Sequence, residues 1–167
     1  MGSSEQGVQK DRYKVIPRVL IFIFKDKDVL LLKGAPTKKI WANKYNGIGG
    51  HVEKGEDALN AARRELSEET GLGIEDLKLT GTVLIDPGGE TGITLYVYYG
   101  DYKGGELKPS IEGSLEWINS ADIGRYPVVE DLITLVPLVR NSFLDGKCFS
   151  GMYRYDKNDQ LVISIFH

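Results

Sequence analysis

The fold of this protein is decided by residues 50–72, which read GHVEKGEDALNAARRELSEETGL. The first part of this stretch is rich in glycine and charge, which is typical of a loop. The acidic Glu56 and Asp57 suit the positive end of a helix that follows, and Gly71 suits a left-handed exit from it. We therefore predict a loop followed by a helix over residues 56–70.

One face of the predicted helix gathers carboxylates. Its apolar stripe, at spacings i, i+3 and i+7, consists of Leu59, Ala62 and Leu66. At about 100° per residue, Glu65, Glu68 and Glu69 share one side of the helix at the edge of this stripe. Such acids repel one another, and hard cations such as Mg²⁺ or Mn²⁺ prefer clustered carboxylate oxygens. On these residues alone, a solvated acidic helix face remains the alternative.

The whole stretch satisfies the pattern Gly-x5-Glu-x7-Arg-Glu-apolar-x-Glu-Glu-x-Gly-apolar. This pattern resembles the Nudix box of the Nudix hydrolases, without departure at a defining position. The resemblance implies an α/β fold, namely an α/β/α sandwich around a central mixed β-sheet with about two main helices. It also implies hydrolysis of a nucleoside diphosphate linked to a further group, with Mg²⁺ as cofactor and Mn²⁺ as an alternative. The metal ligands implied are Gly50, through its carbonyl oxygen, Glu65, Glu68 and Glu69.

The implied reaction is attack of water on a phosphorus atom, in which bound Mg²⁺ neutralises phosphate charge and lowers the pKa of the water. Glu65 is our first choice for the general base, with Glu53 and Glu112 as alternatives. MutT-like members of the family carry an extra metal-binding Glu in a late loop, so Glu112 is also nominated as a ligand. An exposed loop acid is the alternative for it. Arg64 lies four residues before Glu68 and is expected to orient it for catalysis.

Outside this motif, the chain resembles the MutT-like enzymes that hydrolyse oxidised purine nucleoside triphosphates. Residues 45–52, YNGIGGHV, are similar to the segment in which that group binds the purine through an Asn, which nominates Asn46. A turn residue before Gly47 is the alternative. His51 stands where the group has lysine, so the resemblance implies a phosphate contact, and a surface histidine is the alternative. The preceding loop offers further cations for a triphosphate, namely Lys38, Lys39 and Lys44.

Late segments extend the likeness. Residues 116–118 and 126–131 resemble the part of the group in which two adjacent acids hold the edge of the purine, which nominates Glu130 and Asp131. Trp117 is expected to stack on the base. A core tryptophan and a pair of helix N-terminal acids are the alternatives. The acids here are Glu-Asp instead of Asp-Asp and follow one inserted residue, which leaves room for a different base.

The remaining chain predicts a mixed α/β domain. Strands are expected at residues 13–24, 29–32, 77–86, 92–102, 148–155 and 160–166, the first and last pairs as hairpins. Residues 34–45 are expected to form a loop, and a short apolar piece surrounds Trp117. Helical spacing predicts a second helix over residues 127–143, with Pro127 in its first turn. Pro137 inside it predicts a kink or a split.

The length and charge of the chain limit the classes of protein to which it can belong. The 167 residues suit one domain, which we place at residues 11–167 after a flexible polar tail at 1–10. The 21 basic and 24 acidic residues give a net charge of −3, which argues against binding a nucleic acid polymer. The longest apolar run, residues 19–24, is too short to cross a membrane. Cys148 has no second cysteine to pair with, and the start shows no signal peptide, so we expect a cytoplasmic protein.

These observations predict a Mg²⁺-dependent nucleoside triphosphate pyrophosphatase. It would hydrolyse oxidised purine nucleotides such as 8-oxo-dGTP to the monophosphate and pyrophosphate, and so clean the nucleotide pool. The nearest alternative is a Nudix hydrolase of ADP-ribose or a dinucleoside polyphosphate. A non-catalytic nucleotide-binding module is the third, although a pure binder has no need of three repelling acids. The partner is a small nucleotide in each case, and a monomer and a homodimer both remain open.

Overall fold

The computed structural model describes residues 2–9 and 11–167 of the chain. In this part, eight strands form one sheet in the order β3-β2-β1-β5-β4-β7-β8, and β6 pairs with β2. The strands are β1 Lys14–Lys25, β2 Asp28–Gly34, β3 Tyr45–Asn46, β4 Lys78–Asp86, β5 Thr91–Asp101, β6 Gly113–Asn119, β7 Phe149–Tyr155 and β8 Leu161–Phe166. The helices are α1 Ala58–Thr70, α2 Leu132–Asp145 and the short 3₁₀ helices η1 Ser3–Gln6 and η2 Ser120–Arg125.

Strand β1 organises the sheet. It pairs antiparallel with β2 and parallel with β5, from Lys14 opposite Thr91 to Phe24 opposite Asp101. Strand β4 likewise runs antiparallel to β5 and parallel to β7. Apolar layers pack against both faces of the sheet at this central strand, which explains the unbroken apolar run at residues 19–24. The expected mixed sheet is confirmed.

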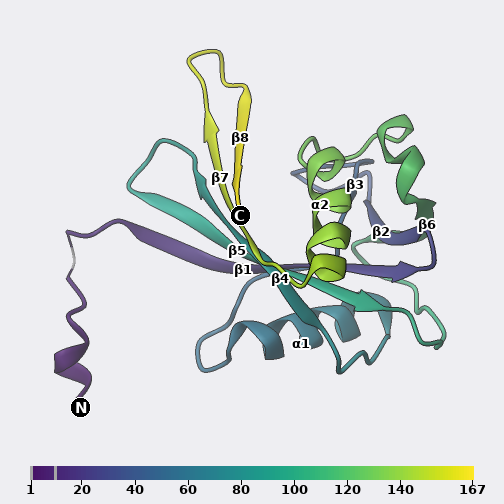
Figure 1. Ribbon diagram of the computed structural model, residues 1–167, viewed down its shortest axis with the longest axis horizontal. Helices are drawn as coiled ribbons and strands as arrows, with labels where there is room; N and C mark the ends of the chain where they lie inside the picture. Colours follow the sequence, from purple (N-terminus) through teal and green to yellow (C-terminus); the bar gives the residue numbers. More distant parts are fainter. Residues whose placement is uncertain (1, 10) are drawn as a thin grey trace.

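The two helices cover opposite faces of this sheet (Figure 1). Because side chains alternate along a strand, one half of the β1 run packs toward each helix. The α1 layer includes Val19, Ile21, Ile23, Ala61, Ala62 and Leu66. The α2 layer includes Leu20, Phe22, Phe24, Leu132, Leu135 and Val139. The molecule is therefore an α/β/α sandwich with two main helices, as expected.

Helix α1 ends at the residue that the sequence indicates and begins two residues later than predicted. The Asp57 carboxylate accepts hydrogen bonds from the amides of Leu59 and Asn60, at 2.9 and 3.0 Å. This N-cap starts the helix at Ala58, two residues later than predicted. Gly71 ends it with a φ of 77°, a left-handed conformation that favours glycine.

Helix α2 begins later than the sequence predicts. The prediction that Pro127 occupies its first turn is wrong, since the helix starts at Leu132. The preceding segment is held on β3 instead: the Tyr45 amide donates to the Pro127 carbonyl, and the Val129 amide to the Tyr45 carbonyl, both at 2.9 Å. Pro137 does not split the helix, because it lies on the exposed side where water can satisfy the freed carbonyl.

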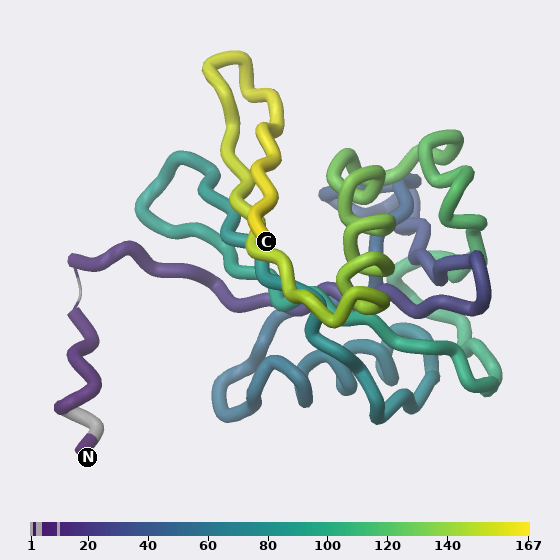
Figure 2. Tube along the Cα trace, viewed as in Figure 1, coloured from purple at the N-terminus to yellow at the C-terminus, as the bar shows by residue number. Residues whose placement is uncertain are grey.

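The remaining elements follow the predicted pattern with one addition. The apolar piece around Trp117 is strand β6, which pairs antiparallel with β2. The closing hairpin β7–β8 is confirmed and stands beside the β4–β5 ribbon (Figure 2). The expected tail over residues 1–10 includes Met1 and Lys10, which lie outside the described residues. Among the described helices, none is long and apolar enough to cross a membrane.

Candidate active site

A glycine-rich loop brings the backbone of residues 47–50 against both β1 and α1. The Val19 amide donates to the Gly50 carbonyl at 2.9 Å, and the Ile21 amide to the Ile48 carbonyl at 2.7 Å. A Cβ at Gly50 would overlap the carboxylate of Glu65 on α1. Only a residue without a side chain allows this approach. The loop thus places Gly50 directly beside Glu65 of α1.

An acidic cavity of about 290 Å³ opens at this point. Its acids are Glu53, Glu65, Glu69 and Glu112, its cations include Arg18, Lys38 and Lys44, and His51 also lines it. The structure thus brings together four of the acids that the sequence nominates. Glu68 is outside the lining, with a side chain that is 61% exposed. Its part in metal binding stays a prediction.

Arg64 holds the motif together by contacts to several acids. Its guanidinium donates to Glu56 at 2.7 Å, to Glu65 at 2.8 Å and to Glu68 at 3.3 Å. It also donates to the His51 carbonyl at 2.9 Å, which ties the helix to the loop. These charge-assisted contacts hold the pKa of the Arg64 guanidinium above its usual range and lower the pKa of Glu56. Arg64 therefore orients Glu65 as well as Glu68.

Glu69 is the buried acid of the cavity, at 8% exposure. Its carboxylate accepts a 3.3 Å hydrogen bond from the Gly49 amide. Burial raises its pKa to about 7, and repulsion from Glu112 and Glu65 adds to the rise, against the lowering effect of the Gly49 amide and of Lys38. Glu65 and Glu112 therefore destabilise the charged form of Glu69, and a cation among the three would relieve this repulsion.

The side chains as they stand do not form a finished metal centre. No three Asp, Glu, His or Cys residues within residues 2–9 and 11–167 converge closely enough to hold an ion. Two acids are instead paired with cations: Glu65 with Arg64, and Glu112 with Lys38 at 2.6 Å. The donor set nevertheless fits Mg²⁺, because carboxylate and carbonyl oxygens face one cavity with room for water.

A second chamber, of about 330 Å³, continues from the first. The two share Arg18, Trp41, Lys44, Asn46, Gly47 and Gly49. Apolar side chains of the sheet line it, together with Glu130, Asp131 and Tyr153, which do not line the first chamber. An elongated ligand with an apolar ring at one end and phosphates at the other would match this arrangement.

Asp131 is directed into the second chamber and is not used to cap α2. It occupies the N-cap position, yet its side chain makes no capping hydrogen bond. Burial raises its pKa to about 6, opposed by the nearby Tyr153 hydroxyl and increased by Glu130. The Tyr153 hydroxyl lies close enough for this effect but forms no hydrogen bond of normal geometry among the described residues. Asp131 and Tyr153 therefore interact with each other in the wall of the second chamber.

The other residues nominated from the sequence differ in whether they line the cleft. Asn46 lines both chambers, and its side-chain oxygen accepts from the Gly47 amide at 2.8 Å, so it also serves the turn. His51 lies at the rim of the acidic cavity. Trp117 lines neither chamber: it packs against Tyr102 in the α1 layer, with ring centroids 5.1 Å apart. This position does not support the prediction that Trp117 stacks on the base.

Three cleft residues were not nominated from the sequence. Trp41 lies at the rim of both chambers and is 44% exposed, a position suited to stacking on a base. Arg18 and Tyr153 come from strands distant in the sequence. The sequence predicts the closing hairpin that carries Tyr153 but gives that residue no role.

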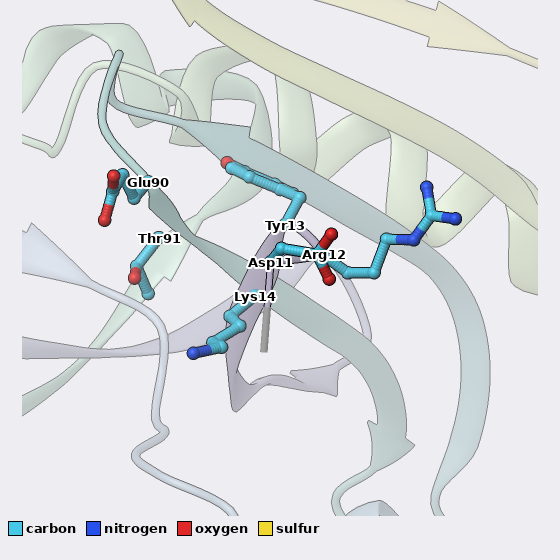
Figure 3. A pocket seen from close by; sticks show the side chains of 6 residues that line it. All are labelled: Asp11, Arg12, Tyr13, Lys14, Glu90 and Thr91. Carbon is cyan, nitrogen blue, oxygen red and sulfur yellow. The ribbon is translucent and has the colours of Figure 1, made fainter. Parts of the chain in front are cut away.

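A third hollow lies away from the acids, between the start of β1 and the β4–β5 connection (Figure 3). Tyr13, Glu90 and Thr91 line it, and the Arg12 side chain extends away from Glu90. No residue of the motif contributes to this hollow. It has no part in the site described above.

The fold and the acidic cavity define an enzyme class, and comparison with known proteins supplies the family. Residues 14–139 match the NUDIX domain, so the chain belongs to the Nudix family of hydrolases, which act on phosphoanhydride bonds. A relative from Danio rerio, the oxidized purine nucleoside triphosphate hydrolase, is 32% identical over 86% of this chain and 88% of its own length. The protein of the same name from Mus musculus is 26% identical over the same shares. Among solved structures, the MutT protein from Bacillus halodurans superposes with a TM-score of 0.74 at 22% identity, covering 90% of this chain and 97% of its own.

Proposed function

We propose that this Nudix hydrolase is a Mg²⁺-dependent pyrophosphatase of oxidised purine nucleoside triphosphates such as 8-oxo-dGTP. The observation that carries the proposal is the continuous cleft. An acidic cavity opens into a second chamber lined by apolar side chains and by the buried Asp131, whose carboxylate does not cap α2. The similarity to the Danio rerio enzyme, over 86% of this chain and 88% of its own length, supports the same substrate class. The products would be the monophosphate and pyrophosphate.

At the phosphate end, the chain contributes the ligands and the base. Glu65, Glu69 and Glu112, with the Gly50 carbonyl, are proposed to hold Mg²⁺, which when bound neutralises phosphate charge and lowers the pKa of water. Glu65 is already positioned by Arg64 and by contact with Gly50, which suits a ligand. Glu53 lines the same cavity and is exposed. Its carboxylate forms no hydrogen bond or ion pair with the described residues, so it is the carboxylate proposed to accept the proton of the attacking water.

At the base end, Asp131 and its neighbours recognise the purine. A carboxyl group with a pKa of about 6 is available in both protonation states near neutral pH. Ionised, it accepts from ring and exocyclic N–H groups; protonated, it can donate to a carbonyl or a ring nitrogen. Trp41 is placed to stack on the base, and Asn46 to donate through its amide nitrogen. Oxidation at the 8-position adds a carbonyl and turns N7 from an acceptor into an N–H donor, and an acid facing that part of the ring could distinguish the two bases.

The test is a pyrophosphate-release screen with Mg²⁺ over 8-oxo-dGTP, normal nucleoside triphosphates, ADP-ribose and dinucleoside polyphosphates. We expect the highest kcat/KM for the oxidised purine. Asp131→Ala should reduce turnover of 8-oxo-dGTP much more than that of dGTP, and equal losses on both would contradict base recognition by Asp131. A preference for ADP-ribose or a dinucleoside polyphosphate would move the protein to another substrate class of the family.

A second variant separates catalysis from binding. Glu69→Gln removes a proposed metal ligand but preserves its shape and its contact with the Gly49 amide. We expect hydrolysis to fall by at least about three orders of magnitude, consistent with loss of metal-assisted chemistry, while the nucleotide still binds. If the unaltered protein binds nucleotides and hydrolyses none of them, it is a binding module.

A further inference from the structure

Arg18 lies in β1 at the junction of the two chambers. Its side chain lines both the acidic cavity and the base chamber. By strand alternation it extends the row formed by Leu20 and Phe22, which packs under α2. The apolar core has no use for a cation at the end of this row. Its position therefore points to a role in the cleft.

No protein group satisfies Arg18 in the described part of the chain. Its Nε atom is buried without a hydrogen-bond partner, although the residue as a whole is only half-buried. Other cations near the cleft differ: Arg64 contacts Glu56 and Glu65, and Lys38 is paired with Glu112. A guanidinium presents a planar fork of donors that matches a carboxylate or a phosphate. Arg18 thus carries a complete anion-binding group that the protein leaves unused.

The backbone fixes Arg18 relative to the acids. It lies opposite His51 in an antiparallel bridge, and the adjacent Val19 amide is bonded to the Gly50 carbonyl. Gly50 in turn touches the Glu65 carboxylate. Backbone hydrogen bonds and the bridge to His51 therefore hold Arg18 in a fixed register beside the proposed metal ligands.

We propose that Arg18 binds the phosphate attached directly to the nucleoside. This inference rests on the proposed function, because it places the base in the second chamber and the terminal phosphates beside the acids. Only the first phosphate then passes the junction where Arg18 lies. Lys44 lines both chambers too, but it is exposed and presents a strongly hydrated point charge. The cleft should accordingly recognise a nucleoside monophosphate even without metal.

The experiment is calorimetric binding in EDTA of 8-oxo-dGMP, dGMP, 8-oxo-deoxyguanosine and inorganic pyrophosphate. Arg18→Gln should weaken binding of the monophosphates by about tenfold or more, as expected for a lost charge-assisted hydrogen bond, and leave the nucleoside unchanged. Arg18→Lys keeps the charge but lacks the planar fork of donors, so its affinity for the monophosphates should lie between those of the unaltered protein and Arg18→Gln. Arg125→Gln is the matched control, because Arg125 is 82% exposed, pairs with Asp122 and lines neither chamber.

Several results would overturn the assignment. Equal weakening of nucleoside and monophosphate by both Arg18 variants would mean that Arg18 only supports packing. Undiminished binding to Arg18→Gln, or no binding of either monophosphate to the unaltered protein, would exclude the contact. Triphosphate turnover is measured with Mg²⁺ on the same preparations. No turnover, together with monophosphate binding that depends on Arg18, would contradict the proposed function and leave this inference standing.

Discussion

At the scale of single residues, the site depends on ionisable side chains that are buried away from water. Asp131 is 9% exposed and sits at a helix N-cap, where its carboxylate would normally accept from the backbone. It makes no such bond, and burial raises its pKa to about 6. A buried acid kept from its structural role costs stability, and such costs are typical of functional sites.

This cost predicts a pH dependence of folding. Between its ordinary pKa of 3.8 and the folded value of about 6, Asp131 keeps its proton in the folded state and loses it in the unfolded state. Stability from this group therefore falls as pH rises through that window, by up to about 3 kcal/mol. We expect Asp131→Asn to be more stable than the unaltered protein at pH 7 and nearly equal at pH 4.

Urea unfolding at both pH values measures this difference. Asp145→Asn, at an exposed acid near the end of α2, serves as the control. A stability difference for Asp131→Asn that is the same at pH 4 and pH 7 would contradict the raised pKa.

A second residue-scale prediction concerns Gly50. A Cβ here would overlap the Glu65 carboxylate, which lies at the end of a flexible side chain and can move aside. Gly50→Ala should therefore fold normally and displace a proposed metal ligand. We expect kcat/KM to fall about 100-fold, since small displacements of catalytic groups have effects of that order. Gly73→Ala is the control, because a Cβ there meets nothing within 4 Å. Full activity of Gly50→Ala would show that this contact is dispensable.

At the scale of elements, α1 was predictable because each signal for it is local. Its acidic start, its apolar stripe and Gly71 at its exit lie within one short stretch. Helix α2 was misplaced at its start because residues 127–129 are held by Tyr45, a contact that no local pattern announces. Strand β6 was missed for the same reason, since it pairs with β2, which lies far away in the sequence, from Asp28 opposite Asn119 to Gly34 opposite Gly113.

The cap of α1 gives a prediction at this scale. Asp57→Ala removes the acceptor of two backbone amides and should cost about 1 kcal/mol, which lowers Tm by about 2–4 °C in a domain of this size. Asp57→Asn, which retains a cap acceptor, should lose much less. Because the acids lie in later turns packed on the sheet, kcat at 25 °C should not change. Thermal unfolding and turnover measured on both variants check this.

At the scale of the whole molecule, the cleft is assembled from β1, the loop before β3, α1 and the C-terminal hairpin. The sequence indicated the acids of the phosphate end because they form one motif. It did not indicate Arg18, Trp41 or Tyr153. Arg18 and Tyr153 line one chamber only because β1 pairs with β5, β5 with β4 and β4 with β7. Strand pairing between distant segments leaves no periodic pattern in the sequence from which it could be predicted.

The position of the acids at the edge of the fold makes a final prediction about metal removal. Two apolar layers on opposite faces of the sheet hold the structure, and the proposed ligands lie outside both. Chelation with EDTA should therefore abolish hydrolysis while the far-ultraviolet circular dichroism stays unchanged.

Adding Mg²⁺ back should restore activity and raise stability modestly, because it relieves repulsion around Glu69. At one hundred times its Kd, the gain would be about 2.7 kcal/mol, and Ca²⁺ at matched saturation controls for charge alone. Loss of secondary structure in EDTA would instead identify the metal as part of the folding core, and unchanged turnover in EDTA would refute a metal-dependent reaction.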